Sequence, residues 1–456
     1  NDFDLLMKVV VIDDDPTGSQ TVNNCLLLLK WDYSTLVKGF KSESNLFFIL
    51  ANTRSLSEND ATLRIKEICN NLKEVIAYED VKKEEIIFVS RGDSTLRGHN
   101  FLEPNTINNC LGPFDATFHI PAFIEGKRFT VNGCHFVDKI PVDQTIFAED
   151  KIFGYKTSNI KNLLFQQSKS QINLDDIQNI KLSDFETLKV EEKNIIFQKL
   201  KNFKNNIHVI LDIENYSQLN KFSLVINKLS KQKRFLFRTA ASFISSISDI
   251  KSNPKKDIFS SNFRRQNNDN KFLPGLVVVG SFVELSTLQL QQLLNISHCE
   301  PIELDVFEFF RIISLENPED KLNFLKKTLL LEIRSNFKKG KTPVLFTSRK
   351  LMSLDCSEQF NFYNSLALFI ANLVADLKNE IGYLISKGGI TTNVILSNGL
   401  EADYVYLEGQ IITGISLVTY KLKNDEKLPI VTFPGNIGTA DSLLKVWSIL
   451  ENKNNC

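Results

Sequence analysis

IIFV at residues 86–89, followed by SRGDSTLRGH at residues 90–99, is the most informative stretch of this chain. The apolar, β-branched first part is typical of a buried strand. The second part then places two arginines, an aspartate, two glycines and a histidine directly after it. A turn capped by Asp93 or Ser94 ahead of a helix is one explanation. The carboxyl edge of a parallel sheet, where open α/β folds bind ligands, is the other.

Two earlier apolar runs end in polar residues in the same way. Lys8–Ile12 leads into three adjacent aspartates, Asp13–Asp15, and Asn45–Ala51 is followed by Arg54. Adjacent carboxylates repel one another unless a cation, a basic partner or water screens them, so a ligand contact is expected there. An acidic turn with Asp15 as an N-cap is the alternative.

The rest of the chain repeats this alternation of apolar and polar segments. Strand-like runs separated by helical patterns occur at 116–123, 207–212, 235–240, 275–281, 343–348, 383–387 and 428–433. Asn132-Gly133 predicts a hairpin turn within 130–137, and 360–381 predicts a long amphipathic helix. The Lys- and Asn-rich segment 157–206 has helical spacing and is assigned no chemistry. Strands that alternate with helices predict an α/β fold with largely parallel sheets.

Length and composition suggest two domains. A chain of 456 residues is too long for one ordinary core. The polar segment near 252–271 has few large apolar residues and is the best linker candidate. We therefore predict an N-terminal domain at 1–252, a linker at 253–272 and a C-terminal domain at 273–456. We expect the active site in the cleft between the domains.

Several classes of protein are disfavoured by composition. Lysine plus arginine equals aspartate plus glutamate at 54 each, so no global charge favours nucleic acid or a membrane surface. The seven cysteines include no CxxC pair, and with the five histidines they form no zinc-type spacing. No apolar stretch approaches the ~20 residues of a membrane span. We expect a cytoplasmic protein with reduced thiols and no structural metal.

The loops of the C-terminal half are rich in glycine and small hydroxyls. Gly280-Ser281, Gly388–Thr391 and Gly435–Gly438 each follow a strand-like run. Glycine lets backbone N–H groups approach an anion closely, which suits nucleotide phosphates. No GxxxxGK[ST] or post-strand GxGxxG occurs, which argues against a Walker A loop and a dinucleotide-dependent dehydrogenase. Tight turns are the alternative for each loop taken alone.

The N-terminal loops offer complementary chemistry. An arginine fork binds a carboxylate bidentately. An aspartate beside a substrate hydroxyl can accept its proton or position it for attack on a γ-phosphate. Together, the two kinds of loop favour a kinase that acts on a small hydroxylated acid.

Taken in order, these motifs resemble the four-carbon acid sugar kinases over nearly the whole chain. The matching segments are Asp13–Gln20, Arg91–Gly98, Pro121–Phe123, Gly280-Ser281, Gly388–Thr391 and Pro434–Gly438. The resemblance implies ATP- and Mg²⁺-dependent phosphorylation of the terminal hydroxyl of threonate, erythronate or 3-oxo-tetronate. It also implies an N-terminal substrate domain and a C-terminal nucleotide domain. Oligomeric state is not readable from the sequence, and a homodimer is compatible with it.

The resemblance assigns roles to particular residues. The residues implied to contact the sugar acid are Asp14, Arg54, Arg91, Asp93, Ser94, Thr95 and Arg97, and those implied to contact ATP are Ser281, Gly388, Gly389, Ile390, Thr391 and Gly435. Asp14 and Asp93 are alternative proton acceptors, of which we favour Asp14. The chain has Asp-Pro-Thr-Gly-Ser-Gln where many relatives have a DDxTGA-type motif, and Ile390 where relatives often carry glutamate.

Two other functions are compatible with parts of this pattern. The absence of a glutamate at position 390 suggests a non-catalytic binder of a sugar acid or nucleotide. A hydrolase that uses His99 or His119 with Ser94 would need a nucleophile elbow, but the chain contains no GxSxG. His99 is better explained as a residue that caps or bridges its loop.

Overall fold

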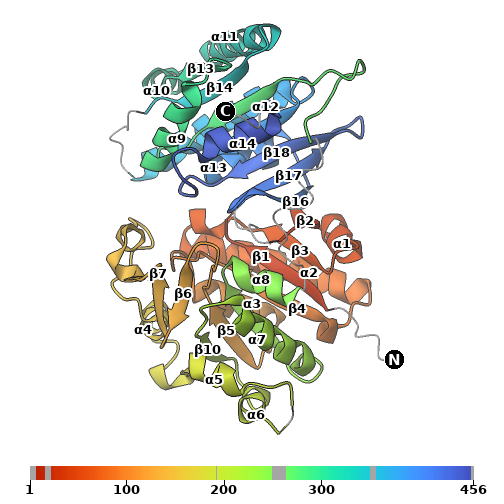
Figure 1. Ribbon diagram of the computed structural model, residues 1–456, viewed down its shortest axis with the longest axis vertical. Helices are drawn as coiled ribbons and strands as arrows, with labels where there is room; N and C mark the ends of the chain where they lie inside the picture. Colours follow the sequence, from red (N-terminus) through yellow and green to blue (C-terminus); the bar gives the residue numbers. More distant parts are fainter. Residues whose placement is uncertain (1–6, 16–21, 192, 249–262, 350–355, 453–456) are drawn as a thin grey trace. The chain divides into compact units, whose positions relative to one another are not determined.

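The computed structural model describes residues 7–15, 22–191, 193–248, 263–349 and 356–452. The chain divides into two compact units, Asn1–Ser252 and Asn253–Cys456. Each unit is built around its own set of mainly parallel strands with helices on both faces (Figure 1). The predicted α/β architecture is confirmed.

Eight parallel strands form the sheet of the N-terminal unit, in the order β9-β10-β5-β11-β4-β1-β3-β2. Val9, Val10 and Val11 are all fully buried, because helices cover both faces of the sheet and alternation is lost. The strands are β1 (Lys8–Asp13), β2 (Cys25–Leu28), β3 (Leu46–Leu50), β4 (Ile86–Arg91), β5 (Ala116–Ile120), β9 (Ile177–Ile180), β10 (Ile207–Leu211) and β11 (Phe235–Thr239).

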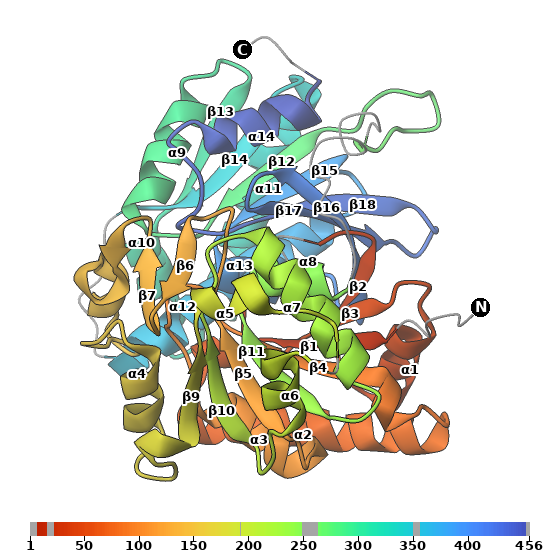
Figure 2. The same cartoon turned by 60° about the horizontal axis from the view of Figure 1, so that its bottom comes forward.

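Right-handed crossovers place α1, α2 and α3 on one face of this sheet and α5, α6 and α7 on the other (Figure 2). The helices are α1 (Tyr33–Lys41), α2 (Glu58–Tyr78), α3 (Leu102–Leu111), α4 (Ile160–Gln167), α5 (Leu182–Thr187), α6 (Ile195–Lys201), α7 (Tyr216–Leu229) and α8 (Ala241–Ile247). A small antiparallel sheet contains β6 (Arg128–Val131), β7 (Cys134–Val137) and β8 (Ile140–Pro141). The short 3₁₀ helices are η1 (Thr53–Ser55), η2 (Lys83–Glu85), η3 (Val142–Gln144), η4 (Ile146–Glu149) and η5 (Leu174–Asp176).

The C-terminal unit has seven strands in the order β13-β14-β12-β15-β18-β17-β16, of which the last two pairings are antiparallel. The strands are β12 (Gly275–Val279), β13 (Cys299–Leu304), β14 (Thr342–Thr347), β15 (Tyr383–Lys387), β16 (Tyr404–Ile412), β17 (Ile415–Lys421) and β18 (Lys427–Phe433). The helices are α9 (Glu284–Leu294), α10 (Val306–Ile313), α11 (Glu319–Lys338), α12 (Cys356–Leu377), α13 (Gly389–Val394) with its π-helical continuation η6 (Ile395–Gly399), and α14 (Ser442–Leu450). Trp447 and Tyr383 are among the largest side chains fully enclosed in its core.

The structure differs from the sequence-based expectations in three places. The segment 157–206 is not wholly helical, because β9 within it forms the edge strand beside β10. The β16–β17 hairpin was not anticipated. Residues 263–272, the described part of the predicted linker, contain a Gln266–Phe272 bridge and bond to Gly382 in the C-terminal unit.

None of the described helices combines the length and apolarity needed to cross a bilayer.

Candidate active site

The carboxyl ends of β3, β1, β4 and β11 lie side by side at one edge of the N-terminal sheet. Asp13 pairs with Leu50 on one side and Arg91 on the other, and Arg91 pairs in turn with Thr239. The register therefore brings the loops that follow these strands together, including η1 with Arg54. The sequence-predicted substrate residues of this half all lie on these loops or strand ends. Residues 16–20 of the motif Asp13–Gln20 lie outside the described residues.

Asp14 is the centre of a buried ion-pair cluster. Its side chain is completely buried and lies 2.6 Å from Arg54, 3.5 Å from Arg91 and 3.6 Å from Arg238. The Arg54 fork also reaches Asp15, at 3.0 Å. Gly98, at φ +99°, lets the loop pass close to this cluster, since a Cβ there would lie 3.2 Å from the Asp14 carboxylate.

Asp93 is held as a carboxylate. Burial by itself raises the pKa of Asp93, but the charges of Arg54 and Arg97, with hydrogen bonds from Arg97 and Thr95, outweigh burial and hold it well below its usual range. Arg97 Nε donates to Asp93 Oδ2 at 2.8 Å. A carboxylate stabilised in this way is a poor proton acceptor at neutral pH. This environment disfavours Asp93 for that role.

Asp13 has the opposite environment and was not among the predicted site residues. Burial raises its pKa to about 7, with further increases from the charges of Asp14 and Asp15, and these effects outweigh Arg91 at 3.4 Å. The sequence places the three aspartates together, but only the fold shows that the buried Asp13 faces one arginine whereas the buried Asp14 faces three.

The raised pKa of Asp13 predicts a pH-dependent stability. The stabilisation from the protonated carboxyl is fully present below the ordinary pKa of about 4 and is lost as pH rises through about 7. Asp13→Asn removes this dependence, so it should stabilise the protein more at pH 7.5 than at pH 4.5, by on the order of 4 kcal/mol at most. Urea denaturation of both proteins at the two pH values measures this difference. An equal difference at both pH values would contradict the assignment.

A second buried network connects the site to α3, and sequence reasoning missed it. Arg238 Nη1 lies 2.7 Å from the buried Glu103 carboxylate and 2.8 Å from Ser90 Oγ. Glu103 also accepts a 2.7 Å hydrogen bond from Thr53 Oγ1. An arginine inside the apolar run 235–240 was the available signal, because buried charges require a partner.

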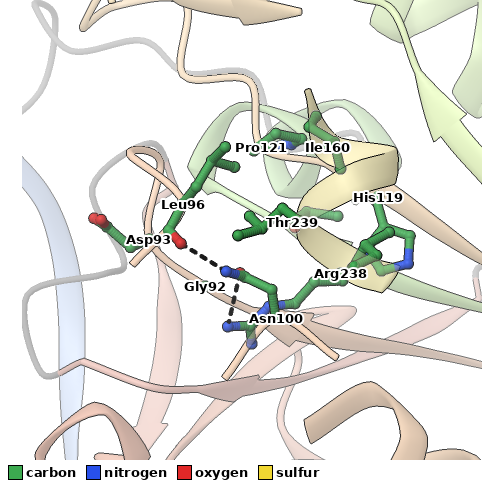
Figure 3. A pocket seen from close by; sticks show the side chains of 11 residues that line it. Gly92, Asp93, Leu96, Asn100, His119, Pro121, Ile160, Arg238 and Thr239 are labelled. Carbon is green, nitrogen blue, oxygen red and sulfur yellow. Dashed lines mark hydrogen bonds between the residues drawn. The ribbon is translucent and has the colours of Figure 1, made fainter. Parts of the chain in front are cut away.

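A small cavity of about 20 Å³ lies beside this network, with room for about one water molecule (Figure 3). Its wall includes Gly92, Asp93, Arg238 and Thr239. In Figure 3, Asn100 links Leu96 to Arg238 through two hydrogen bonds.

Several buried donors at this edge of the sheet have no acceptor in the described part of the chain. They are Nε of Arg91, Arg128 and Arg238 and the hydroxyl of Thr239. Arg128 interacts electrostatically with Asp93, Arg97 and Arg91. Because unsatisfied buried donors are costly, a ligand rich in acceptor oxygens would stabilise them.

The loop after β4 is held by hydrogen bonds to neighbouring segments and does not provide the N-cap of a helix. The alternative explanation, in which Asp93 or Ser94 is the N-cap of a helix, is wrong, since α3 begins at Leu102 and its N-cap is Phe101. The Ser94 carbonyl accepts from His135 Nε2 at 2.8 Å, and the Thr95 carbonyl accepts from the Tyr155 hydroxyl. His99 Nε2 lies 3.1 Å from the Leu56 carbonyl, so it bridges two loops as anticipated.

The glycine loops of the C-terminal unit also converge. The N–H of Gly280 donates to the Lys387 carbonyl, and that of Gly388 to the Phe433 carbonyl, so the loops after β12, β15 and β18 are adjacent. The first helical hydrogen bond of α13 runs from Thr392 N–H to Gly388. The amides of Gly389, Ile390 and Thr391 therefore have no acceptor within the helix.

Two side chains of α9 hold these loops and were missed by the sequence analysis. Ser286 Oγ lies 3.0 Å from Ser281 Oγ and 2.9 Å from the Gly435 carbonyl. Gln289 Nε2 donates to the carbonyls of Ile437 and Thr439. A Cβ at Gly435 would lie 2.6 Å from Ser281 Oγ, so only glycine leaves the backbone free at this point. Ile390, which the resemblance implies as an ATP contact, has a side chain that is 55% exposed.

The backbone at Gly388 supplies a sharp test of this loop. Its φ is +121° and a Cβ would lie 3.1 Å from Ser281 N, whereas Gly340, at φ +69°, has nothing within 4 Å. If this loop holds ATP–Mg²⁺, as the sequence predicts, Gly388→Ala should weaken that binding by about tenfold or more, because a strain of about 1–3 kcal/mol would fall on the loop. Gly340→Ala also places an alanine at a positive φ, but away from the loop, and should leave the affinity unchanged. Calorimetry of both variants tests this, and equal affinities would contradict the role of Gly388.

The described residues include no group of three or more histidine, cysteine, aspartate or glutamate side chains able to hold a metal ion.

Comparison with known protein families agrees with this division of the chain. Residues 9–247 match the model of a sugar-binding N-terminal domain, and residues 276–443 match that of a nucleotide-binding C-terminal domain. A D-erythronate kinase from Heliobacterium modesticaldum is 27% identical over 175 residues, which are 37% of this chain and 38% of that protein. The aligned part is thus less than half the length of this curated relative.

Solved structures share the fold over nearly the full length. A Haemophilus influenzae protein of the DUF1537 family superimposes with a TM-score of 0.63, covering 97% of this chain and 100% of its own at 17% identity. A protein from Salmonella typhimurium LT2, provisionally named a tRNA synthase, gives 0.68 over 96% and 98% at 14% identity. The fold and the matched pair of families define a two-domain protein with an N-terminal domain of the sugar-binding family and a C-terminal domain of the nucleotide-binding family. The chain belongs to the four-carbon acid sugar kinase family.

Proposed function

We propose that this protein is a kinase that transfers the γ-phosphate of ATP to the terminal hydroxyl of a four-carbon sugar acid. The main support is the set of buried donors in the N-terminal unit, Nε of Arg91, Arg128 and Arg238 with the Thr239 hydroxyl, that lack acceptors in the described chain. A short polyhydroxy acid carries a carboxylate and several oxygens within the reach of such a cluster. The D-erythronate kinase relative supports the four-carbon class.

In this proposal Asp14 accepts the proton of the attacking hydroxyl, and Arg54 and Arg91 bind the substrate carboxylate. Asp93 stays ionised and holds Arg97 and Arg54 in place, since those two arginines keep its pKa low. Fixing the hydroxyl and the base in one geometry is the main contribution of a phosphotransferase.

The glycine loops of the C-terminal unit fit the phosphates of ATP. The first amides of α13, which have no acceptor within the helix, and the space that a Cβ at Gly435 would fill offer donors without side-chain obstruction. Ser281, Gly388–Thr391 and Gly435 would hold the nucleotide. Mg²⁺ would arrive with ATP, mainly on its phosphate oxygens, and neutralise charge during transfer.

The test is an ADP-release assay with ATP, Mg²⁺ and a panel of D-erythronate, D-threonate, L-threonate and 3-oxo-tetronate. At least one acid should stimulate ADP release and gain a phosphate by mass spectrometry. Erythritol, which lacks the carboxylate, is the matched control and should be inactive. If calorimetry shows binding of ATP–Mg²⁺ and of an acid but no phosphate is transferred, the protein is a non-catalytic binder and the kinase proposal is wrong.

A further inference from the structure

Arg128 is a buried arginine to which no part of the substrate has yet been assigned. It is the first residue of β6 and is 9% exposed. The turn that leads to it follows β5, which pairs with β11 next to β4. The neighbouring strand β7 is tied to the loop after β4, because His135 on β7 bonds to the Ser94 carbonyl. Arg128 therefore belongs to the same edge of the sheet as the candidate substrate site.

Two aromatic rings hold the Arg128 guanidinium in place. Its central carbon lies 5.6 Å from the centroid of the Phe123 ring and 5.7 Å from that of Phe147. The guanidinium of Arg97 lies over the same Phe147 ring, at 5.3 Å, and its Nε lies 2.8 Å from the Asp93 carboxylate. The backbones of Arg128 and Phe123 also exchange two hydrogen bonds of 2.9 Å. The Arg128 cation is thus fixed beside the Arg97–Asp93 pair.

The charge of Arg128 is not balanced in the way that the neighbouring charges are. Arg54 and Arg91 each lie within 3.5 Å of two aspartates. Arg238 pairs with Glu103 at 2.7 Å. Within the described parts of the chain, no carboxylate forms an ion pair with Arg128, its Nε has no acceptor, and burial lowers its pKa. An uncompensated buried cation is costly, so a ligand that brings a negative charge is favoured at this point.

We propose that Arg128 determines the specificity of this site for an anion, because its guanidinium pairs with the carboxylate of the sugar acid. Arg54 and Arg91 donate hydrogen bonds to the same carboxylate, but their own charges are already balanced by aspartates. The identification of the ligand as a sugar acid rests on the proposed function, whereas phosphate transfer is not needed for this role.

The position of the carboxylate predicts a kinetic signature for Arg128. The carboxylate and the reacting hydroxyl are at opposite ends of the substrate, so the pair with Arg128 is as strong in the ground state as in the transition state. Arg128→Met should therefore raise KM by about 30-fold or more and leave kcat nearly unchanged. Arg128→Lys keeps the charge without the guanidinium fork and should restore much of the affinity.

The test is calorimetry of the full-length protein with D-erythronate and with its neutral amide, D-erythronamide. The wild type should bind the acid about 30-fold or more tightly than the amide, and Arg128→Met should bind the two with similar affinity. Lys127→Met is the matched control, because it removes a cation at the neighbouring position, where the side chain is 71% exposed. This control should keep the preference of the wild type for the acid.

A second measurement needs no ligand. Since Arg128 is an unpaired buried charge, Arg128→Met should leave the thermal unfolding midpoint of the ligand-free protein unchanged or raise it by a few degrees. An arginine with a purely structural role would lower the midpoint on replacement. A fall in the midpoint together with weaker binding of the acid and the amide alike would overturn the proposal.

The outcomes separate this role from the kinase activity. If the wild type prefers the acid, Arg128→Met loses this preference and no phosphate is transferred, the role of Arg128 stands and the kinase proposal fails. If phosphate is transferred but Arg128→Met keeps the preference for the acid, the kinase proposal stands and the role of Arg128 is wrong. If the wild type binds neither compound, the specificity assigned to Arg128 is wrong as well.

Discussion

Arg238→Met is expected to lower the free energy of unfolding of the N-terminal unit by about 3–5 kcal/mol. Arg238 is 4% exposed and lies 2.7 Å from the Glu103 carboxylate, which is itself fully buried. Its guanidinium also forms an ion pair with the Asp14 carboxylate, at 3.6 Å. Methionine preserves most of the side-chain volume but leaves Glu103 without a cationic partner. The loss is large because an uncompensated buried charge remains.

The double variant Arg238→Met/Glu103→Met separates the ion pair from simple packing. Removing both charges abolishes the uncompensated carboxylate, so the double variant should recover about half of the lost stability. Recovery is incomplete because the hydroxyls of Thr53 and Ser90 lose their acceptor on Glu103. A double variant less stable than Arg238→Met would contradict the assignment of this pair.

The measurement can be confined to one unit. The chain has two tryptophans, Trp31 in the N-terminal unit and Trp447 in the C-terminal unit. In a Trp447→Phe background, Trp31 fluorescence during urea denaturation reports on the N-terminal unit. Arg234→Met is a matched control just before the start of the same strand, because its guanidinium donates to the backbone carbonyls of Pro113 and Leu111. Its cost should be about 1 kcal/mol.

The strands and the polar loops at their carboxyl ends could be predicted because the sequence patterns that mark them are local. An apolar run followed by polar residues, as at Ile86–Val89, places a loop at the carboxyl end of a strand without knowledge of any distant contact. Asp14, Arg54 and Arg91 were found in this way, and the structure brings all three together. Recognition of the family also depended on such local motifs.

The buried network behind the site could not be predicted in the same way. Arg238 and Glu103 are 135 residues apart, and nothing near either residue indicates the other. The differing environments of Asp13, Asp14 and Asp93 likewise depend on which side chains the fold brings close. The assembly of the two predicted ligand sites across a cleft, and a homodimer, stay predictions.

Asp14→Asn should lower kcat/KM for the sugar acid by about 10³-fold, with most of the loss in kcat. The amide cannot accept the proton of the attacking hydroxyl, and its NH₂ group would face the guanidinium donors that now bind both carboxylate oxygens. Arg54 by itself donates to both carboxylate oxygens of Asp14, at 2.6 and 3.2 Å. Loss in kcat is expected because proton transfer occurs in the transition state.

Asp15→Asn is the control for this prediction, because it makes the same chemical change at the next position. Asp15 also pairs with Arg54, at 3.0 Å, but its side chain is 21% exposed, so solvent screens the interaction and kcat/KM should change by less than about fivefold. If Asp14→Asn raises KM and leaves kcat intact, Asp14 only positions the arginines. The proton acceptor would then be sought at Asp13, whose pKa of about 7 suits a general base and should appear as the acidic limb of the kcat profile.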